Sequence, residues 1–174
     1  MKPWNVLVTS LLGQEKDVYG ELSRTGDFRQ TDFRDVFIGW TDDIEAFLSS
    51  VLANTFLKER IGKAVPIERI FSFHVEDFEE KLEEAVQFYL PRLAGSRVHV
   101  RMERRGFKGR LNSLEMEQKM DRLIKERLIE AGKGCEIDFK DPDHILAVET
   151  VADWCGVSVI TREIKERYPF IKVR

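Results

Sequence analysis

Residues 97–115 read RVHVRMERRGFKGRLNSLE, and this stretch decides the fold of the second half of the chain. In its first part polar and apolar residues alternate, and the apolar set consists of Val98, Val100 and Met102. Strict alternation indicates a β-strand with one buried face. Gly106 and Gly109 then interrupt the pattern. Asn112, followed three residues later by Glu115, has the spacing of a capping box at a helix start. The segment therefore predicts a strand, a glycine loop and a helix in succession.

The same segment concentrates positive charge. Residues 97–110 hold six cations against one acid, Glu103, although the whole chain has a net charge of −3. The cations are Arg97, Arg101, Arg104, Arg105, Lys108 and Arg110. Arginine side chains beside the free N–H groups of a helix N-terminus suit the binding of phosphates. We therefore predict an anion-binding surface, with Asn112 and Ser113 presenting the helix end.

Two alternatives stay open at this surface. The arginines could be solvated, or paired with carboxylates of neighbouring strands such as Glu136, Asp138 and Glu149. Phe107 could stack on an unpaired base or pack beneath the sheet.

Length and composition set broader limits. The chain has 174 residues, of which 43% are hydrophobic, which suits one domain or two small ones with a real core. Its two cysteines, Cys135 and Cys155, are too few for a disulfide framework and do not form a CxxC zinc motif. No apolar run approaches the roughly 20 residues needed to cross a bilayer. We expect a soluble, cytoplasmic protein without a membrane partner.

The first half alternates between strand and helix patterns. The expected elements are a strand at 4–11, a helix at 15–24, strands at 28–33 and 36–40, a helix from Asp42, and a strand at 67–73. This β-α-β-β-α-β order predicts a ferredoxin-like domain over residues 1–74. Residues 75–174 form a second, α/β domain, so the predicted fold class is α+β. Its further elements are a helix from Asp77, a short strand at 135–139, a turn at 141–143, and strands at 145–151 and 157–161.

Three stretches of the second domain resemble the THUMP domain of RNA thiouridine synthases, methyltransferases and pseudouridine synthases. They are residues 97–115, CEIDFKDPDHILAVETV at 135–151 and CGVSVITRE at 155–163. The ERRGxK motif at 103–108, with the closing TRE and YPFIK, is most similar to the stand-alone adaptors of tRNA N4-acetylcytidine formation. The resemblance covers roughly residues 75–174.

The resemblance implies tRNA binding at the acceptor arm and 3′ end, with presentation of the tRNA to a separate modification enzyme. The residues that would contact RNA are Arg101, Arg104, Arg105, Lys108, Arg110, Asn112 and Ser113. Arg162 could join them or anchor the fold through an ion pair. Lys58, Arg60 and Lys63 could extend the positive track or form a solvated helix end.

Catalytic motifs are missing from the sequence. It has no phosphate-binding GxxxxGK[ST] loop, no GxGxxG after a strand and no supported Cys–His or Ser–His pair. The two expected domains also fill the chain. We therefore expect no catalytic residues, cofactor or metal, and a protein that is not an enzyme. One alternative is a small RNA-modifying or metal-dependent enzyme that uses Asp141, Asp143, His144 and Glu149. Another is a protein-interaction module that uses an apolar patch on the first domain. The oligomeric state, the enzyme partner and the modified nucleotide stay open.

Overall fold

The computed structural model describes residues 2–173, which divide into two compact units. One unit comprises Met1–Ile70 and Glu163–Lys172, and the other is built from Phe71–Arg162. The division near Ile70 lies close to the expected boundary at residue 74. Nothing in the sequence pattern indicated that residues 163–172 join the first unit. Within that unit, the N–H of Ala64 donates to the carbonyl of Phe170 at 3.1 Å.

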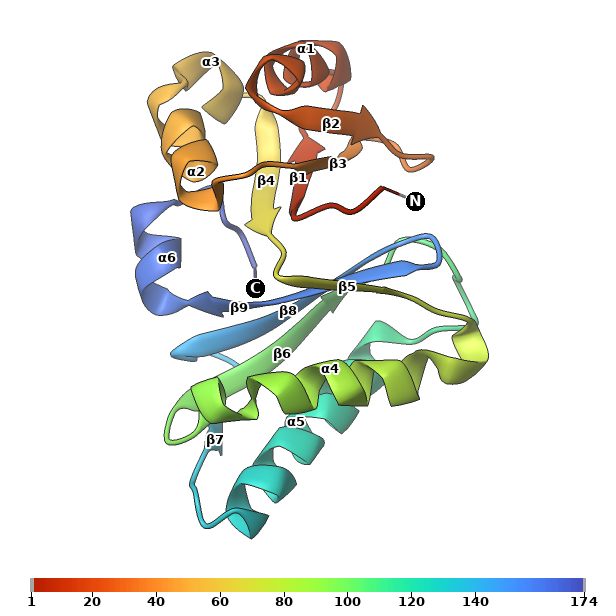
Figure 1. The fold of residues 1–174 in the computed structure, drawn as a ribbon, viewed down its shortest axis with the longest axis vertical. Coiled ribbons are helices and arrows are strands. Elements are labelled where there is room, and N and C mark those ends of the chain that lie inside the picture. Colours follow the sequence, from red (N-terminus) through yellow and green to blue (C-terminus); the bar gives the residue numbers. More distant parts are fainter. Residues whose placement is uncertain (1, 174) are drawn as a thin grey trace. The chain divides into compact units, whose positions relative to one another are not determined.

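The first unit contains a four-stranded antiparallel sheet with helices (Figure 1). Its elements are β1 (Val6–Ser10), α1 (Glu15–Thr25), β2 (Asp27–Gln30), β3 (Val36–Trp40), α2 (Ile44–Ala53), α3 (Thr55–Lys58) and β4 (Ile61–Pro66), followed late in the chain by α6 (Arg162–Arg167). The sheet order is β2-β3-β1-β4. The strand expected at 67–73 is present as β5 (Arg69–Ser72), but it belongs to the other sheet. The strand that pairs with β1 on this side is β4, which was not expected and which ends at Pro66 opposite Val6. Proline is tolerated there because a strand end needs no further ladder donor.

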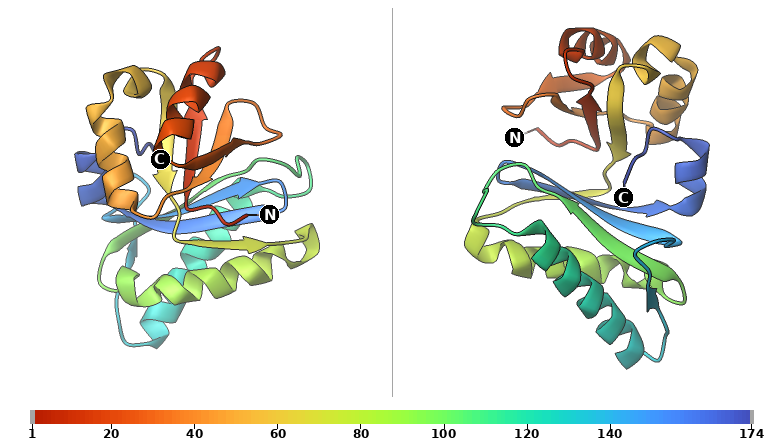
Figure 2. Two further views of the ribbon diagram at one scale, coloured as in Figure 1. Left: turned by 45° about the horizontal axis from the view of Figure 1, so that its top comes forward. Right: turned by 180° about the vertical axis from the view of Figure 1, so that it is seen from behind.

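The second unit packs two helices on one face of a mixed sheet (Figure 2). Its elements are the 3₁₀ turn η1 (Val75–Asp77), α4 (Phe78–Leu93), β6 (Arg97–Glu103), α5 (Ser113–Glu130), β7 (Glu136–Ile137), β8 (His144–Val151) and β9 (Trp154–Thr161). The sheet order is β5-β9-β8-β6-β7, where β5 is Arg69–Ser72. Strand β6 runs parallel to β7 and β8, and β8 pairs antiparallel with β9. Val98, Val100 and Met102 join the core with both helices, as their alternation predicted.

Side chains of α5 cover part of the edge of β6. Strand β7 pairs only with the first two residues of β6. Farther along, the N–H of Val100 donates to Asp121 Oδ1 and the N–H of Met102 donates to Glu117 Oε1, both at 2.8 Å. N–H groups two residues apart on a strand are separated by about 6.6 Å, and side chains four residues apart on a helix are separated by about 6 Å along its axis. Because these spacings are similar, the carboxylates of Glu117 and Asp121 on α5 can each reach one of two alternate N–H groups of β6. The two carboxylates thus replace part of an absent neighbouring strand.

The expected surface position of His99 was wrong, because one of these carboxylates holds its side chain in the interior. Its Nδ1 lies 2.9 Å from Asp121 Oδ2, and the residue is only 4% exposed, whereas alternation placed it on an outer face. Arg101 Nη1 similarly donates to Glu117 Oε2 at 3.4 Å. Helix α5 therefore removes His99 from the surface. No helix in the described part of the chain is long and apolar enough to span a membrane.

Replacing Asp121 with alanine should lower the free energy of unfolding by about 2–4 kcal/mol, because the buried N–H of Val100 and the imidazole of His99 lose their partner. Urea denaturation of the two proteins measures the change. Asp121→Asn keeps an oxygen acceptor and should cost less. Glu126→Ala, on an exposed position of the same helix, should change stability by less than about 0.5 kcal/mol. An Asp121→Ala protein as stable as the wild type would show that the edge does not need this carboxylate.

Candidate nucleic-acid interface

The loop between β6 and α5 turns sharply through left-handed backbone. Gly106, Phe107 and Gly109 have φ angles of 104°, 51° and 80°. The carbonyl of Phe107 accepts the N–H groups of Arg110 and Leu111, both at 3.0 Å. The side chain of Asn112 then accepts the N–H of Glu115 at 3.1 Å and caps α5. The loop therefore delivers the chain into a helix N-terminus in a defined conformation.

Four cations at this loop and the strand before it keep part of their surface in solvent. Lys108 is exposed and has no ion-pair partner among residues 2–173. Arg110 is exposed, and its Nη2 lies 3.2 Å from Oε1 of the equally exposed Glu76, a kind of pair that contributes little to stability. Arg104 is half-buried and donates to the carbonyl of Gly106. Arg101, on β6, keeps part of its side chain in solvent beside Glu117. These side chains are accessible to an anionic ligand.

Arg105 does not belong to this exposed set. It is 8% exposed, with Nη1 2.6 Å from Glu149 Oε2 and Nη2 2.8 Å from Glu103 Oε1. Its backbone N–H donates to Thr150 Oγ1 at 2.9 Å. The expectation that this guanidinium lies open to solvent was therefore wrong, and the alternative pairing with Glu149 is what the structure shows.

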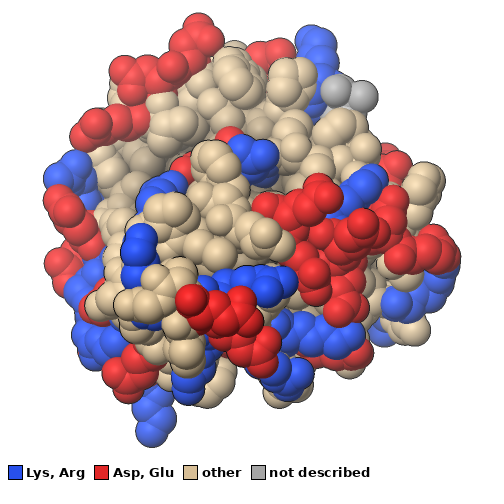
Figure 3. Space-filling model, turned by 60° about the horizontal axis from the view of Figure 1, so that its bottom comes forward, with Lys and Arg blue, Asp and Glu red and all other residues tan. Residues whose placement is uncertain are grey.

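A hollow of about 690 Å³ lies beside the loop, at the start of α5 and around η1 and the first turn of α4. Its charged lining includes Arg104, Arg110, Lys119, Glu76, Glu79 and Glu115. Lys119 Nζ lies 2.9 Å from Glu79 and 3.2 Å from Glu115, and hydrogen bonds to these carboxylates raise the pKa of the lysine. Figure 3 shows acidic and basic side chains interspersed on one face of the molecule. The positive charge is therefore confined to the loop and does not extend over the surrounding surface.

Phe107 packs against the core of the second unit. Its ring centroid lies 5.6 Å from that of Phe73, and the Arg110 guanidinium lies 5.9 Å from its centroid. Of the two roles left open for this ring, packing beneath the sheet is the one its position shows.

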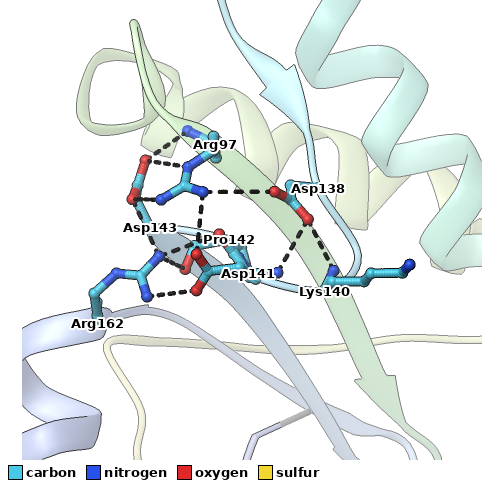
Figure 4. Close-up of polar contacts among 7 residues, drawn as sticks. All are labelled: Arg97, Asp138, Lys140, Asp141, Pro142, Asp143 and Arg162. Carbon is cyan, nitrogen blue, oxygen red and sulfur yellow. Dashed lines mark hydrogen bonds and ion pairs between the residues drawn. The ribbon is translucent and has the colours of Figure 1, made fainter.

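The acidic turn after β7 is neutralised by two arginines (Figure 4). Arg97 Nη2 donates to Asp143 Oδ1 at 2.9 Å, and its Nη1 donates to Asp141 Oδ2 at 3.1 Å. Arg162, at the start of α6, pairs with the same two aspartates. The hydrogen bonds from Arg97 and Arg162 hold the pKa of Asp143 well below its ordinary value. The ion-pair role that the sequence left open for Arg162 is thus the one the geometry supports.

The alternative enzyme site does not assemble at this turn. Asp141 and Asp143 are engaged by arginines, and Glu149 lies farther along β8 in its pair with Arg105. His144 is half-buried, and burial lowers the pKa of its imidazole. Among residues 2–173 no three His, Cys, Asp or Glu side chains are arranged to hold a metal ion.

The three basic residues proposed for the first unit do not form one exposed track. Lys58 is exposed at the end of α3, but Lys63 is buried in β4. The Arg60 guanidinium lies over the ring of Phe56, 3.7 Å from its centroid, and its Nε is 3.5 Å from Asp17. The expected surface position of Lys63 was wrong because residues 61–66 form a strand rather than a helix end.

Comparison with known proteins gives a likeness of fold. No family model and no curated protein matches the chain. TrmN from Thermus thermophilus superposes with a TM-score of 0.62 at 19% identity, over 88% of this chain and 44% of that one. PH1313 from Pyrococcus horikoshii Ot3 gives 0.60 at 13% identity, over 91% and 55%. A 4-thiouridine synthetase in complex with RNA and ATP gives 0.56 at 18% identity, over 91% and 41%. These likenesses show a shared mixed α+β fold.

The same comparisons correct the expectation that the protein is not an enzyme. Besides the synthetase, the structures that share this fold include one described as a methyltransferase in complex with SAH and another described as a methylase, from Clostridium difficile 630. The chain spans about half of the length of TrmN and PH1313 and less than half of the others. The fold is therefore one that occurs within enzymes.

The acidic turn should make stability depend on pH. A carboxyl whose pKa is lower in the folded than in the unfolded chain stabilises the fold fully above its unfolded pKa, about 4, and this contribution is lost as the pH falls below that value. Urea denaturation between pH 7 and roughly pH 3 should therefore show a smaller loss of stability in Asp143→Asn than in the wild type. Asp32→Asn, at an exposed loop position, is the control and should follow the wild type. An identical pH dependence in Asp143→Asn would contradict the role of the turn.

Substitutions at Arg105 and Lys108 should have different effects on the free energy of unfolding, because Arg105 is in a buried ion pair and Lys108 is exposed. Arg105→Ala leaves the buried carboxylate of Glu149 without its guanidinium partner and should lower the free energy of unfolding by about 3–5 kcal/mol. Lys108→Ala, three residues along the same loop, should change it by less than about 0.5 kcal/mol. Thermal and urea unfolding measure both variants. Equal stabilities would mean that the Arg105 pair is not structural.

Proposed function

We propose that this protein binds tRNA through the loop between β6 and α5 and holds the acceptor arm and 3′ end for modification of a base elsewhere on the same tRNA. The observation that carries the proposal is the group of accessible cations beside the N-terminus of α5, formed by Arg101, Arg104, Lys108 and Arg110. A fold shared with a 4-thiouridine synthetase in complex with RNA supports it.

The chemistry of this surface suits a phosphate backbone. Arginine presents a planar set of donors that can grip a phosphate through two hydrogen bonds, and Lys108 adds a mobile point charge. The side chain of Asn112 accepts a hydrogen bond from the N–H of Glu115. The other N–H groups in the first turn of α5, beginning at Ser113, have no partner within the helix and can donate to a phosphate. Arg105 and Arg162 act in folding in this proposal, because both are held by carboxylates.

The finer assignment follows the sequence resemblance. We infer that the first unit, with its β2-β3-β1-β4 antiparallel sheet, is a ferredoxin-like domain and that the second is a THUMP domain. In a cytoplasmic adaptor role, the protein would present bound tRNA to a separate modification enzyme. Holding the two together raises their effective concentration and fixes the orientation of the target base.

A second candidate function is protein interaction. Several large apolar side chains of the first unit are exposed, which is the feature expected of an interaction module. They include Leu11, Leu12, Trp40 and Phe56.

Salt-dependent binding tests the RNA interface. Filter binding should show tighter association with whole tRNA than with tRNA lacking the single-stranded 3′ end or with duplex DNA. Arg110→Ala should weaken binding and reduce the slope of log K against log salt by about one unit for each phosphate that the variant no longer neutralises. Arg104→Ala and Lys108→Ala should behave alike.

Arg127→Ala is the matched control. Arg127 is an exposed arginine of the same unit, 3.3 Å from Glu130, as Arg110 is 3.2 Å from Glu76. Its replacement should leave the slope unchanged. Unchanged slopes in all three loop variants, or equal binding to every nucleic acid, would refute the proposal.

A further inference from the structure

The first turn of α5 exposes a large apolar side chain beside the RNA-binding loop. Leu114 is the second residue of the helix, and its side chain is 60% exposed. It lines the same hollow as Arg104 and Arg110. Single exposed leucines are ordinary on protein surfaces, but this one lies among the accessible cations of the proposed interface. A ligand that those cations attract therefore meets an apolar side chain next to them.

The hollow suits an uncharged group better than a phosphate. Its volume of about 690 Å³ lies within the range of about 300–1,000 Å³ that is typical of pockets for small organic groups. The carboxylates of Glu76, Glu79 and Glu115 belong to its lining. They would repel a phosphate inside the hollow, but they can accept hydrogen bonds from the N–H groups of a nucleobase. The chemistry therefore favours phosphates at Arg104 and Arg110 and a neighbouring base in the hollow.

The aromatic residue of the loop is not available to cover such a base. Phe107 packs against the core of the second unit, with its ring centroid 5.6 Å from that of Phe73. An unpaired base needs an apolar or aromatic partner for its exposed face, and leucine is among the side chains that pack against unstacked bases in nucleic-acid complexes. Leu114 therefore offers the contact that Phe107 cannot make.

We propose that Leu114 packs against the face of an unpaired base and so gives the interface its preference for single-stranded RNA ends. The proposal rests on the tRNA-binding function proposed above and assigns a specificity-determining residue to it. Arg104 and Arg110 attract the phosphates of any nucleic acid, since contacts to phosphate carry no information about the bases. A base inside a duplex has both faces covered by its stacked neighbours. Leu114 therefore distinguishes an unpaired end from a duplex, which the cations alone do not.

Binding to two RNA hairpins tests the proposal, one with a single-stranded 3′ overhang and the other with the same stem and a blunt end. The wild type should bind the overhang hairpin more tightly. Leu114→Gln removes the apolar contact without changing the charge, so it should weaken binding of the overhang hairpin about fivefold. The affinity for the blunt hairpin and the salt dependence of binding should stay unchanged. Leu114→Phe offers a larger apolar face and should bind the overhang hairpin at least as tightly as the wild type.

Ile129→Gln serves as the control, because Ile129 is 59% exposed near the other end of the same helix. It should bind both hairpins as the wild type does, and thermal unfolding should show that the variants at both exposed positions stay folded. A wild type that binds both hairpins equally, or a Leu114→Gln protein that loses no affinity or loses it equally for both, overturns the proposal and leaves the tRNA-binding function standing. A wild type that binds neither hairpin overturns that function and this proposal with it.

Discussion

The arrangement of the second unit depends on hydrogen bonds from the edge of one parallel strand to the carboxylates of one helix. Asp121 and Glu117 accept the N–H groups of Val100 and Met102, and each uses its other oxygen for a side chain of the same strand. These bonds set α5 against β6 in a fixed register. Because the loop at 104–112 connects these two elements, its two ends are fixed, and its glycines and left-handed Phe107 close the turn between them.

That constraint divides the cations of one short segment into two groups. Arg97 and Arg105 are held by carboxylates that stabilise the fold, whereas Arg104, Lys108 and Arg110 stay on the loop surface. A charge excess in the sequence therefore overstates the charge that a ligand meets. The remaining cations lie beside a helix end, where a few of them suffice for a local anion-binding surface within an acidic protein.

Sequence periodicity predicted most of the elements, and it failed where the deciding partner is remote. The strand, loop and helix at 97–130 followed from alternation, glycines and a capping pattern. Strand β4 was missed because Gly62 and Lys63 interrupt its apolar pattern. The burial of Arg105 depends on Glu149, 44 residues away, and that of His99 on Asp121. A pattern read locally shows that a side chain is charged, but not which distant group neutralises it.

The pairing of the β6 edge with carboxylates of α5, where another strand could otherwise lie, also affects solubility. An open strand edge offers a row of unpaired N–H and C=O groups on which another chain can be added, the first step toward fibrous aggregates. Beyond the two residues that β7 covers, β6 already donates two of its N–H groups to negatively charged groups of α5. A strand from another molecule would have to displace those carboxylates before it could pair with β6. Helix α5 therefore disfavours the addition of a strand at this edge of the sheet.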